Sequence, residues 1–475
     1  MPDTPVGPRP PAYPTALPPA VLSLALGLWG VRRGGSMWRD EAVSYDMAHR
    51  SLPDLWATLG QADAVHGLYY LLLHGLFAVF GDADPLLVLR LPSVLATAVA
   101  SGTLALLGRR LARPRAGLLA GVVFALLPPV QRYAQEGRSY ALVCALVVWA
   151  SYLLVRAVET RSRRVWAGYG AVMVAACLLH EFAVLAVVAH LVALPRSARR
   201  TGLWVAAVVC GCLAPLAVVS MGQSAQVAWI GGVGGDLAGF AGVTVLGLVC
   251  AVLLRRDPPA RRGPLTGFAL ALLVLPALLL LLSTPFKPLF VDRYVLYGHA
   301  GAALLVGAAL DRLLRARGRI RAVAVLAAGA AVLVLLPASL SLRTPQSRPD
   351  DVTAVAEAVR AAGRDGDGVL YMPSRRRVWS LVDPGSVRGL RDLALGRGPV
   401  ASHTLYGTEL PAAEIRARIS AAARLVVVRD PVGQPLDQTA QEQAKRRVLA
   451  EHFVRCGTRR VQGAEISVYA RPGRC

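Results

Sequence analysis

The sequence predicts a mainly α-helical protein, a polytopic transmembrane bundle of about eleven spans followed by a small C-terminal α/β domain. Hydrophobic residues make up 55% of the 475 residues and charged residues only 17%, and the mean hydropathy is +0.49. Soluble domains carry about 25% charged residues. Apolar runs of span length recur from residue 14 to residue 341, and a helix of roughly 20 such residues can cross a bilayer with its own backbone hydrogen bonds satisfied.

The expected spans follow these apolar runs along the chain. Their ranges are 14–31, 86–108, 116–131, 139–157, 165–181, 183–195, 203–221, 238–254, 264–284, 294–311 and 322–341. With the termini of the bundle included, we expect a transmembrane domain over 1–344 and a second domain over 345–475.

Arginine-rich loops set the expected orientation. Five alternate loops are strongly basic: "RRLARPR" (109–115), "RAVETRSRR" (156–164), "RSARR" (196–200), "RRDPPARR" (255–262) and "RLLRARGRIR" (312–321). The positive-inside rule places these loops in the cytoplasm. The loops 32–85, 130–138, 180–182, 222–237 and 285–293 then face outward, and the C-terminal domain is extracytoplasmic. Arg32 and Arg33 are the exception, because they lie at the outer end of the first span.

The formal net charge of +23 does not indicate a nucleic-acid binder. Nearly all basic residues are Arg, and many of them sit in short loops between spans, where they determine topology. A basic face with interleaved aromatic residues is absent from the sequence. We therefore expect no nucleic-acid partner and a multi-pass protein of the plasma membrane.

The first outer loop predicts two helices lying in or near the membrane interface. "SLPDLWATLG" starts with a Ser51/Asp54 capping pattern and a proline in the first turn. The segment 66–81 is apolar and aromatic but short for a full crossing. We expect Trp56, Tyr69 and Tyr70 at the level of the lipid headgroups.

The C-terminal segment alternates helices and strands. "DDVTAVAEAVRAAG", "ELPAAEIRARISAAA" and "QTAQEQAKRRVLAEHF" predict helices, and "GVLYMP", "RLVVVRD" and "EISVYAR" predict strands. No glycine-rich phosphate loop accompanies them, so we assign this domain no catalytic role. Its Cys456 and Cys475 are a candidate disulfide in an oxidising compartment, although spacing does not establish the bond. The five other cysteines lie in apolar runs.

Unusual charged and aromatic residues gather in four segments that the topology places on the outer face. The segments are "WRDE" (38–41), "QRYAQEGRSY" (131–140), "HEF" (180–182) and "PFKPLFVDRY" (285–294). Acids beside cations suit an anionic substrate, since a general base can act next to groups that neutralise a phosphate leaving group. Ionisable groups near the bilayer are costly and favour a functional explanation.

Each segment taken alone also has a structural explanation. Asp40 and Glu41 would solvate a loop or cap a helix, and Arg132 and Arg138 would anchor at the interface. The pair His180–Glu181 would stabilise a tight turn, and Asp292 would start a helix. His66 and His74, eight residues apart on one helical face, would pack in a core. The convergence of all four segments on one face favours an active site.

At these residues the sequence resembles the GT-C glycosyltransferases, specifically the family-39-like, protein-mannosyltransferase-related bacterial members. The shared pattern begins with "DEAVSYDMAH" after the first span and continues with "VHGLYYLLLHGLFAVFG". "RLPS" (90–93) opens the second span, "EGRSYAL" follows the third, and Arg293-Tyr294 come late. Relatives commonly have a proline after the histidine of the second motif, where this chain has Gly67, and this leaves the shape of the acceptor side open.

The resemblance implies inverting transfer of one mannose-like sugar from a polyprenyl-phosphate donor to a lipid, glycan or protein acceptor on the outer face. Asp40 would be the general base, and Glu41 would orient Asp40 or bind the acceptor. The donor phosphate would be held by Arg138, with Lys287 or Arg293 as alternatives, and Arg132 is a further candidate. Tyr140 and Tyr294 would line the donor groove.

Two points stay open at the level of sequence. Some members of the resembled family use a divalent metal, and His66, His180 or Glu181 are candidates on the acceptor side, but the spacing does not require a metal. A transporter or flippase for a lipid-linked or anionic solute is the alternative function, although transporters usually bind near the midplane on broken helices within repeated halves. A non-catalytic subunit that binds cell-wall polymer is a third.

Overall fold

The computed structural model describes residues 13–223, 234–255 and 259–475, and these form two compact units. The helical unit comprises Met1–Trp29 and Arg90–Leu340. The mixed unit comprises Gly30–Leu89 and Ser341–Cys475. This division differs from a boundary at residue 344, because the first outer loop forms one unit with the C-terminal domain.

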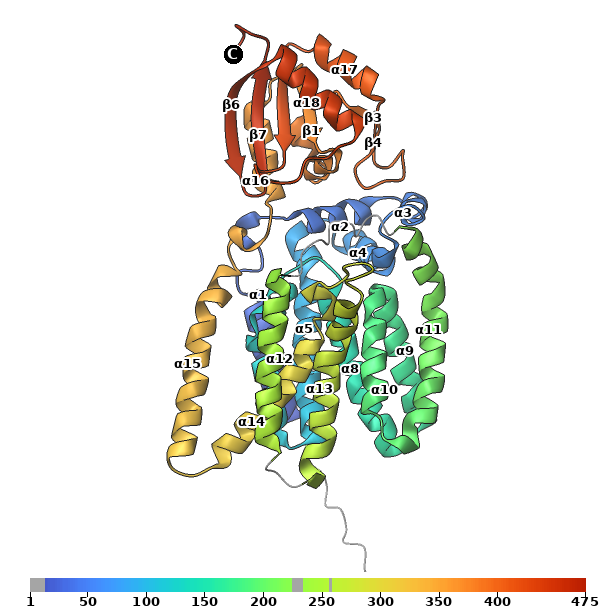
Figure 1. Cartoon of the computed structure of the whole chain (residues 1–475), viewed down its shortest axis with the longest axis vertical. Coiled ribbons are helices and arrows are strands. Elements are labelled where there is room, and N and C mark those ends of the chain that lie inside the picture. The colour runs from blue at the N-terminus through green and yellow to red at the C-terminus, as the bar shows by residue number, and fades with distance from the viewer. Residues whose placement is uncertain (1–12, 224–233, 256–258) are drawn as a thin grey trace, which may run out of the picture. The chain divides into compact units, whose positions relative to one another are not determined.

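Helices occupy every expected span (Figure 1). They are α1 (Tyr13–Leu28), α5 (Pro85–Leu111), α6 (Pro114–Leu126) with α7 (Pro128–Ala134), α8 (Tyr140–Thr160), α9 (Arg163–Leu179), α10 (Val184–Ala193), α11 (Arg199–Gly222), α12 (Gly234–Leu254), α13 (Pro259–Leu282), α14 (Gly298–Arg315) and α15 (Arg319–Ser341). Among the described residues, seven helices are long and apolar enough to cross a membrane, or eight if α6 and α7 form one bent span. The fold is that of a multi-pass membrane protein.

The expected span 116–131 is broken rather than straight. Helices α6 and α7 meet at an angle of 65°, and Leu127 between them is extended, with ψ of 125°. Pro128 and Pro129 follow directly, and proline both lacks an N–H and disfavours a helical conformation in the residue before it. The break turns α7 and its polar residues away from the direction of α6.

Small residues allow the helices of the helical unit to approach closely. A Cβ atom on Gly307 of α14 would overlap the backbone of Ala120 in α6, and one on Gly117 of α6 would overlap the backbone of Ala105 in α5. In a membrane, helix association depends on such close backbone packing, because lipid tails are as apolar as leucine side chains.

The mixed unit begins with three short helices, α2 (Arg39–His49), α3 (Leu52–Leu59) and α4 (Gly67–Phe80). The predicted cap of α3 is confirmed, because Ser51 Oγ accepts the Asp54 N–H at 3.3 Å. Trp56 is 74% exposed, in line with an interfacial position. The expectation for Tyr69 and Tyr70 was wrong, because both side chains are buried. The Tyr69 hydroxyl donates to Leu89 O, and that of Tyr70 donates to the Asp63 carboxylate.

The C-terminal part has the predicted alternation of helices and strands. Its elements are α16 (Val352–Ala362), β1 (Gly368–Met372), β2 (Arg391–Asp392), β3 (Leu395–Arg397), β4 (Thr408–Glu409), α17 (Ala412–Ala421), β5 (Arg424–Arg429), α18 (Ala440–His452), β6 (Val454–Val461) and β7 (Ala464–Ala470). The main sheet has the order β2-β1-β5-β7-β6, parallel among β2, β1 and β5 and antiparallel at β7 and β6. The short strands β2, β3 and β4 and the edge strand β6 were not predicted.

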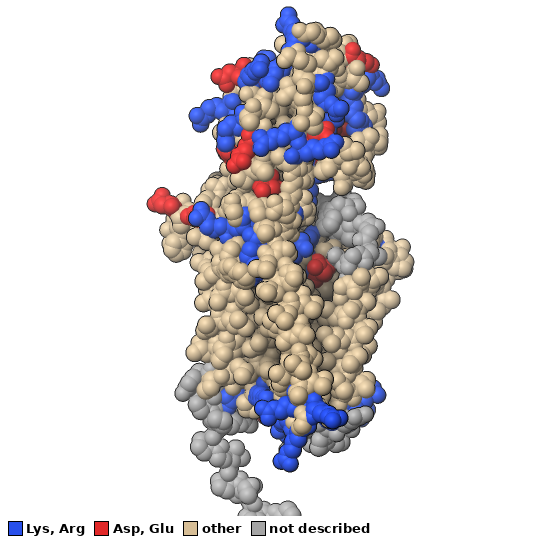
Figure 2. All heavy atoms as spheres, turned by 90° about the vertical axis from the view of Figure 1, so that its left-hand side faces the viewer, with Lys and Arg blue, Asp and Glu red and all other residues tan. Residues whose placement is uncertain are grey.

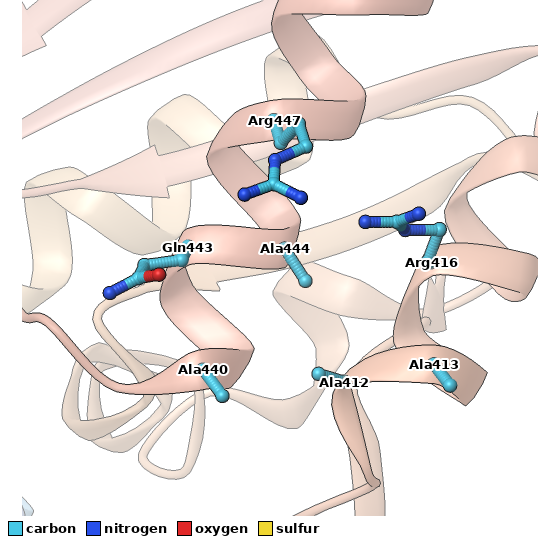
Figure 3. A pocket seen from close by; sticks show the side chains of 7 residues that line it. All are labelled: Ala412, Ala413, Arg416, Ala440, Gln443, Ala444 and Arg447. Atoms are coloured by element: carbon cyan, nitrogen blue, oxygen red, sulfur yellow. The ribbon is translucent and has the colours of Figure 1, made fainter.

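Helices α17 and α18 cover one face of this sheet. Ile415 and Ile419 of α17 and Val448 of α18 share a buried core with strand residues such as Leu425. Between the two helices lies a groove of about 350 Å³, lined mainly by alanines, with Arg416 from α17 and Gln443 and Arg447 from α18 (Figure 3). Cys456 and Cys475 form a disulfide, which ties the end of the chain to β6.

Candidate active site

The N-terminus of α2 carries Asp40 and Glu41 in the mixed unit. Glu41 accepts the backbone N–H of Trp38 at 3.4 Å at the start of the helix. The same carboxylate binds Arg33, with Nη2 and Oε2 separated by 2.7 Å and both side chains fully buried. Arg33 has a φ of 44°, a left-handed conformation that is uncommon for residues other than glycine. The buried ion pair fixes this residue in the turn before α2.

Two acidic partners explain the exception to the positive-inside pattern. Arg33 pairs with Glu41, and Arg32 Nη2 lies 2.5 Å from the Asp84 carboxylate. A paired arginine contributes little net positive charge to the loop. These two arginines therefore have a structural role at the turn rather than a topogenic one.

Asp40 differs from Glu41 in its accessibility. Its side chain is 18% exposed and forms an ion pair with Arg39, whose Nε lies 3.7 Å from Asp40 Oδ1. Electrostatic interaction also couples Asp40 to Asp350, at the start of the C-terminal part. Asp40 is thus a partly accessible carboxylate in the first turn of α2.

His66 and Gly67 lie at the start of α4 in the same unit. His66 is buried, with Nε2 4.0 Å from the Asp63 carboxylate and its ring 6.1 Å from the ring of Tyr70. A Cβ on Gly67 would come within 3.0 Å of Leu59 Cδ1. A side chain at this position would require Leu59 to move by a few tenths of an ångström, which favours the glycine.

In the helical unit an aromatic cluster forms around His180. The His180 ring lies 5.6 Å from Tyr140, 5.5 Å from Phe182 and 4.7 Å from Tyr294, measured between ring centroids. Tyr140 is the first residue of α8, His180 follows α9, and Tyr294 belongs to a short 3-10 turn before α14. The structure thus brings together three of the four segments singled out from the sequence.

Hydrogen bonds join these segments. The Tyr133 hydroxyl donates to Asp292 Oδ1 at 2.8 Å, and the Tyr297 hydroxyl donates to Phe182 O at 3.1 Å. Ser93, the last residue of the "RLPS" motif, donates to Glu136 O at 2.6 Å. Of these, Tyr133 and Tyr297 were not identified from the sequence, because a tyrosine near a span end is a common interfacial residue.

Four cations lie in this region of the helical unit. The Arg293 guanidinium lies 5.6 Å from the ring centroids of both Tyr140 and Tyr294. Arg132 Nε lies 3.7 Å from the Glu136 carboxylate, and Arg138 is buried at 7% exposure. Lys287 interacts electrostatically with Glu181. A guanidinium within about 6 Å of an aromatic ring centroid is attracted by the ring electrostatically.

The metal candidates from the sequence do not form a cluster. Glu181 accepts a hydrogen bond from Ser220 Oγ at 2.6 Å, and the His180 ring packs among aromatic rings. His66 belongs to the mixed unit. Within the ranges that the structure covers, no three His, Cys, Asp or Glu side chains are grouped so that they could hold a metal ion. The described His, Cys, Asp and Glu side chains therefore do not fit a metal centre.

The basic loops gather at the other end of the helical unit. Arg110, near the end of α5, binds Glu159 in the last turn of α8 at 2.5 Å, and Arg115 of α6 lies 3.8 Å from Asp311 in α14. Figure 2 shows Lys and Arg gathered at this end, next to a broad uncharged band on the same face. Tyr140 and Glu159 lie at opposite ends of α8, which spans about 30 Å at 1.5 Å per residue. The basic loops and the aromatic cluster are therefore separated by about the thickness of a bilayer core.

Two predicted loops lie partly outside the described residues. The outer loop 222–237 falls largely, and the basic loop 255–262 in part, on residues that the structure does not describe. Arg90 is fully buried in α5. His74 of α4 contacts the backbone of α2, with Nδ1 2.9 Å from Ala48 O, and has a packing role.

Comparison with known proteins supports the same fold. Residues 67–221 match the family model of dolichyl-phosphate-mannose-protein mannosyltransferases, which is less than half of the chain. No curated protein sequence matches at a significant level. The resemblance of the sequence to GT-C membrane glycosyltransferases is confirmed.

Solved structures cover nearly the whole chain. The ArnT structure from Cupriavidus metallidurans bound to undecaprenyl phosphate has a TM-score of 0.57 and 13% identity, over 96% of this chain and 98% of that one. The apo form of the same protein has a TM-score of 0.56. The apo oligosaccharyltransferase from Archaeoglobus fulgidus has a TM-score of 0.55 and 11% identity, over 87% of this chain and 69% of that one. At these identities the likeness establishes the GT-C fold.

Proposed function

We propose that this GT-C-fold protein is an inverting glycosyltransferase that moves a single, mannose-like sugar from a polyprenyl-phosphate donor to an acceptor on the extracytoplasmic face. The observation that carries the proposal is the cluster of aromatic and cationic side chains at one end of the helical unit, opposite the basic loops. Three segments far apart in sequence build this cluster. The ArnT structure with undecaprenyl phosphate, which shares the fold, supports a lipid-phosphate donor.

Asp40 acts as the general base in this proposal. The acceptor hydroxyl attacks the anomeric carbon of the donor sugar, and Asp40 takes up the hydroxyl proton as the new glycosidic bond forms. The bond between the anomeric carbon and the phosphate oxygen breaks at the same time, and the polyprenyl phosphate leaves. A single displacement of this kind inverts the anomeric centre. The solvent access of Asp40, compared with the fully buried Glu41, supports its assignment.

The cations stabilise the departing phosphate. We assign Arg138 and Arg293 to the donor phosphate, with Lys287 and Arg132 next to them. Positive groups fixed in a site that excludes water stabilise developing negative charge strongly. The position of Arg293 next to the rings of Tyr140 and Tyr294, within the aromatic cluster, supports this assignment.

The remaining residues position the reactants. Tyr140 and Tyr294, both buried in the aromatic cluster, are assigned to the wall of the donor groove, where they pack against Arg293. Glu41 orients the first turn of α2 through its contacts with Trp38 and Arg33. Its complete burial favours this orienting role over direct contact with the acceptor. In this proposal the C-terminal domain lies outside the cell. The acceptor is a lipid, a glycan or a protein.

An assay with purified protein in lipid tests the proposal. Polyprenyl-phosphate donors carrying mannose, other hexoses or pentoses are supplied with candidate acceptors, and transfer is measured for the wild type, Asp40→Asn and Asp82→Asn. Asp82 is an exposed acid in the same loop and serves as the matched control. Loss of the general base should reduce transfer on the order of 10²- to 10⁴-fold, while Asp82→Asn stays near wild type.

Two results would contradict the proposal. Wild-type transfer rates in Asp40→Asn would exclude the assigned base. A wild-type protein that moves an intact lipid-linked sugar across the bilayer without cleaving it would identify a flippase instead.

A further inference from the structure

The start of α2 is held by the segment that leads into the C-terminal domain. The Val352 N–H donates to Met37 O at 2.7 Å, and the Met37 N–H donates to Thr353 Oγ1 at 3.3 Å. The Arg39 N–H donates to Asp350 Oδ1 at 2.7 Å. These residues are more than 300 positions apart along the chain, and both segments belong to the mixed unit.

Asp350 supplies a cap that the local sequence of α2 lacks. The first N–H groups of an α-helix have no partner within the helix and need an external acceptor. The residue before α2 is Trp38, whose side chain has no oxygen to act as an acceptor, in contrast to the usual Ser, Thr, Asp or Asn. Arg39 is the first residue of α2, and Asp350 accepts its N–H. The negative charge of Asp350 is also favourable at a helix N-terminus.

The neighbours of Asp350 come from several elements. Arg376 Nη1 lies 3.9 Å from the Asp350 carboxylate, and Arg376 also pairs with Asp430. Its guanidinium lies 4.2 Å from the ring centroid of Trp379. On the side of α2, Arg39 and Asp40 interact with Asp350 electrostatically. Burial raises the pKa of Asp350, the negative charge of Asp40 adds to this, and the two arginines oppose it.

We propose that Asp350 is a positioning residue for Asp40. In this way a residue of the C-terminal domain holds the first turn of α2, which carries the general base. This inference rests on the function proposed above for Asp40. Asp40 follows Arg39 directly, so the hydrogen bond to the Arg39 N–H fixes the backbone from which the Asp40 side chain projects. Catalysis depends on such placement, because a shift of about 1 Å can cost on the order of 10²-fold in rate.

Three variants separate this role from general stability. Asp350→Ala removes the acceptor, and Asp350→Asn keeps an oxygen that can accept the Arg39 N–H. Asp367→Ala is the matched control, because Asp367 is also a buried acid of the C-terminal part that accepts a backbone N–H, from Arg364 at 2.8 Å, and pairs with an arginine, Arg424.

The expected result is a change in kcat rather than in KM. Asp350→Ala should lower kcat on the order of 10- to 100-fold with the KM values of donor and acceptor within about twofold. Asp350→Asn should recover most of the lost rate, and Asp367→Ala should keep wild-type kcat. If Asp350→Ala does not fold, Thr353→Val removes a neighbouring contact and should lower kcat in the same direction by a smaller factor.

Amide hydrogen exchange gives a readout that does not depend on activity. In Asp350→Ala the amides of residues 39–42 should exchange faster than in the wild type, while Asp367→Ala leaves them unchanged, because exchange reports local opening. Wild-type kcat and wild-type exchange in Asp350→Ala would overturn the inference, and so would an equal loss of kcat in Asp367→Ala. If the wild type transferred no sugar but the amides of residues 39–42 still exchanged faster in Asp350→Ala, the proposed function would be wrong. The capping contact between Asp350 and α2 would nevertheless be supported.

Discussion

The Tyr133 hydroxyl donates a hydrogen bond to the Asp292 carboxylate at 2.8 Å and joins two segments that are 159 residues apart. Asp292 also accepts the N–H of Arg293 at 2.6 Å. The contact therefore connects the bent helix α7 to the turn that carries Arg293 and Tyr294. A single phenolic oxygen thus helps to set where the cationic and aromatic groups of the candidate site stand.

Tyr133→Phe should remove the hydrogen bond between these two segments while leaving the fold intact. Loss of one hydrogen bond costs about 1 kcal/mol of stability, so the protein should remain folded. We expect kcat/KM to fall on the order of 10-fold, because Arg293 and Tyr294 lose part of their support. Tyr152→Phe is the control, since Tyr152 lies against Arg110 near the basic loops. Equal effects of the two variants would argue against a specific role of Tyr133.

Arg138→Gln tests the phosphate site. Removal of a positive group that stabilises the leaving phosphate should lower kcat/KM on the order of 10²-fold or more, and Arg138→Lys should restore part of it. Arg110→Gln, at the end with the basic loops, should transfer sugar at the wild-type rate. Steady-state kinetics with a polyprenyl-phosphate donor measures both. A wild-type value for Arg138→Gln would remove Arg138 from the site.

The buried pair of Arg33 and Glu41 should be strongly coupled. Glu41→Gln leaves the charge of Arg33 buried without that carboxylate, which typically costs about 3–5 kcal/mol. Replacing both residues, as in Arg33→Met with Glu41→Gln, should recover most of this loss. Denaturant unfolding in detergent gives the free energy for each variant. Additive losses in the double variant would show that the two side chains are not coupled.

Cysteine labelling tests the sidedness on which the site depends. Phe286 is 94% exposed, Gln61 is exposed in the first loop, and Thr160 is exposed at the end of α8. We expect a membrane-impermeant maleimide to label Phe286→Cys and Gln61→Cys in intact cells, and Thr160→Cys only after permeabilisation. If Phe286→Cys and Gln61→Cys were labelled from opposite sides of the membrane, the two loops would not both be extracytoplasmic. The proposed active site would then be refuted.

Asp350 should make stability depend on pH. Burial raises its pKa in the folded state above the ordinary value of 3.8. Below 3.8 both the folded and unfolded states hold the proton. As the pH rises from 3.8 through the raised pKa, the unfolded chain loses its proton first, so the contribution of this group to stability falls.

Asp350→Asn removes this dependence. The free energy of unfolding of Asp350→Asn, relative to that of the wild type, should therefore be larger near pH 7 than near pH 4. Thermal unfolding of both proteins at the two pH values measures the difference. A relative stability that stays constant, or that falls as the pH rises, would contradict a raised pKa.

Local patterns in the sequence predicted the elements of the fold well. The apolar runs gave helices at every expected span, and Ser51 with Asp54 gave the start of α3. Hydropathy and helix capping depend on residues only a few positions apart. Spans and helix starts can therefore be predicted from the sequence alone. The buried state of Tyr69 and Tyr70 was missed, because the same aromatic pattern suits an interface and a packed helix.

The candidate site was predicted in its segments but not in its contacts. The sequence singled out 131–140, 180–182 and 285–294, and the structure brings His180, Tyr140 and Tyr294 together. It gave no signal for the pairing of Tyr133 with Asp292, because each residue has a common interfacial explanation.

The sequence by itself determined a polytopic helical protein, its basic loops and a terminal α/β domain, because burial in lipid requires long apolar helices whatever their partners. Only the tertiary structure decided that Arg33 neutralises Glu41 and that Asp350 caps the helix carrying Asp40. Such contacts join residues that are remote in the chain and depend on the direction of single side chains. They leave no periodic pattern in the sequence from which they could be inferred.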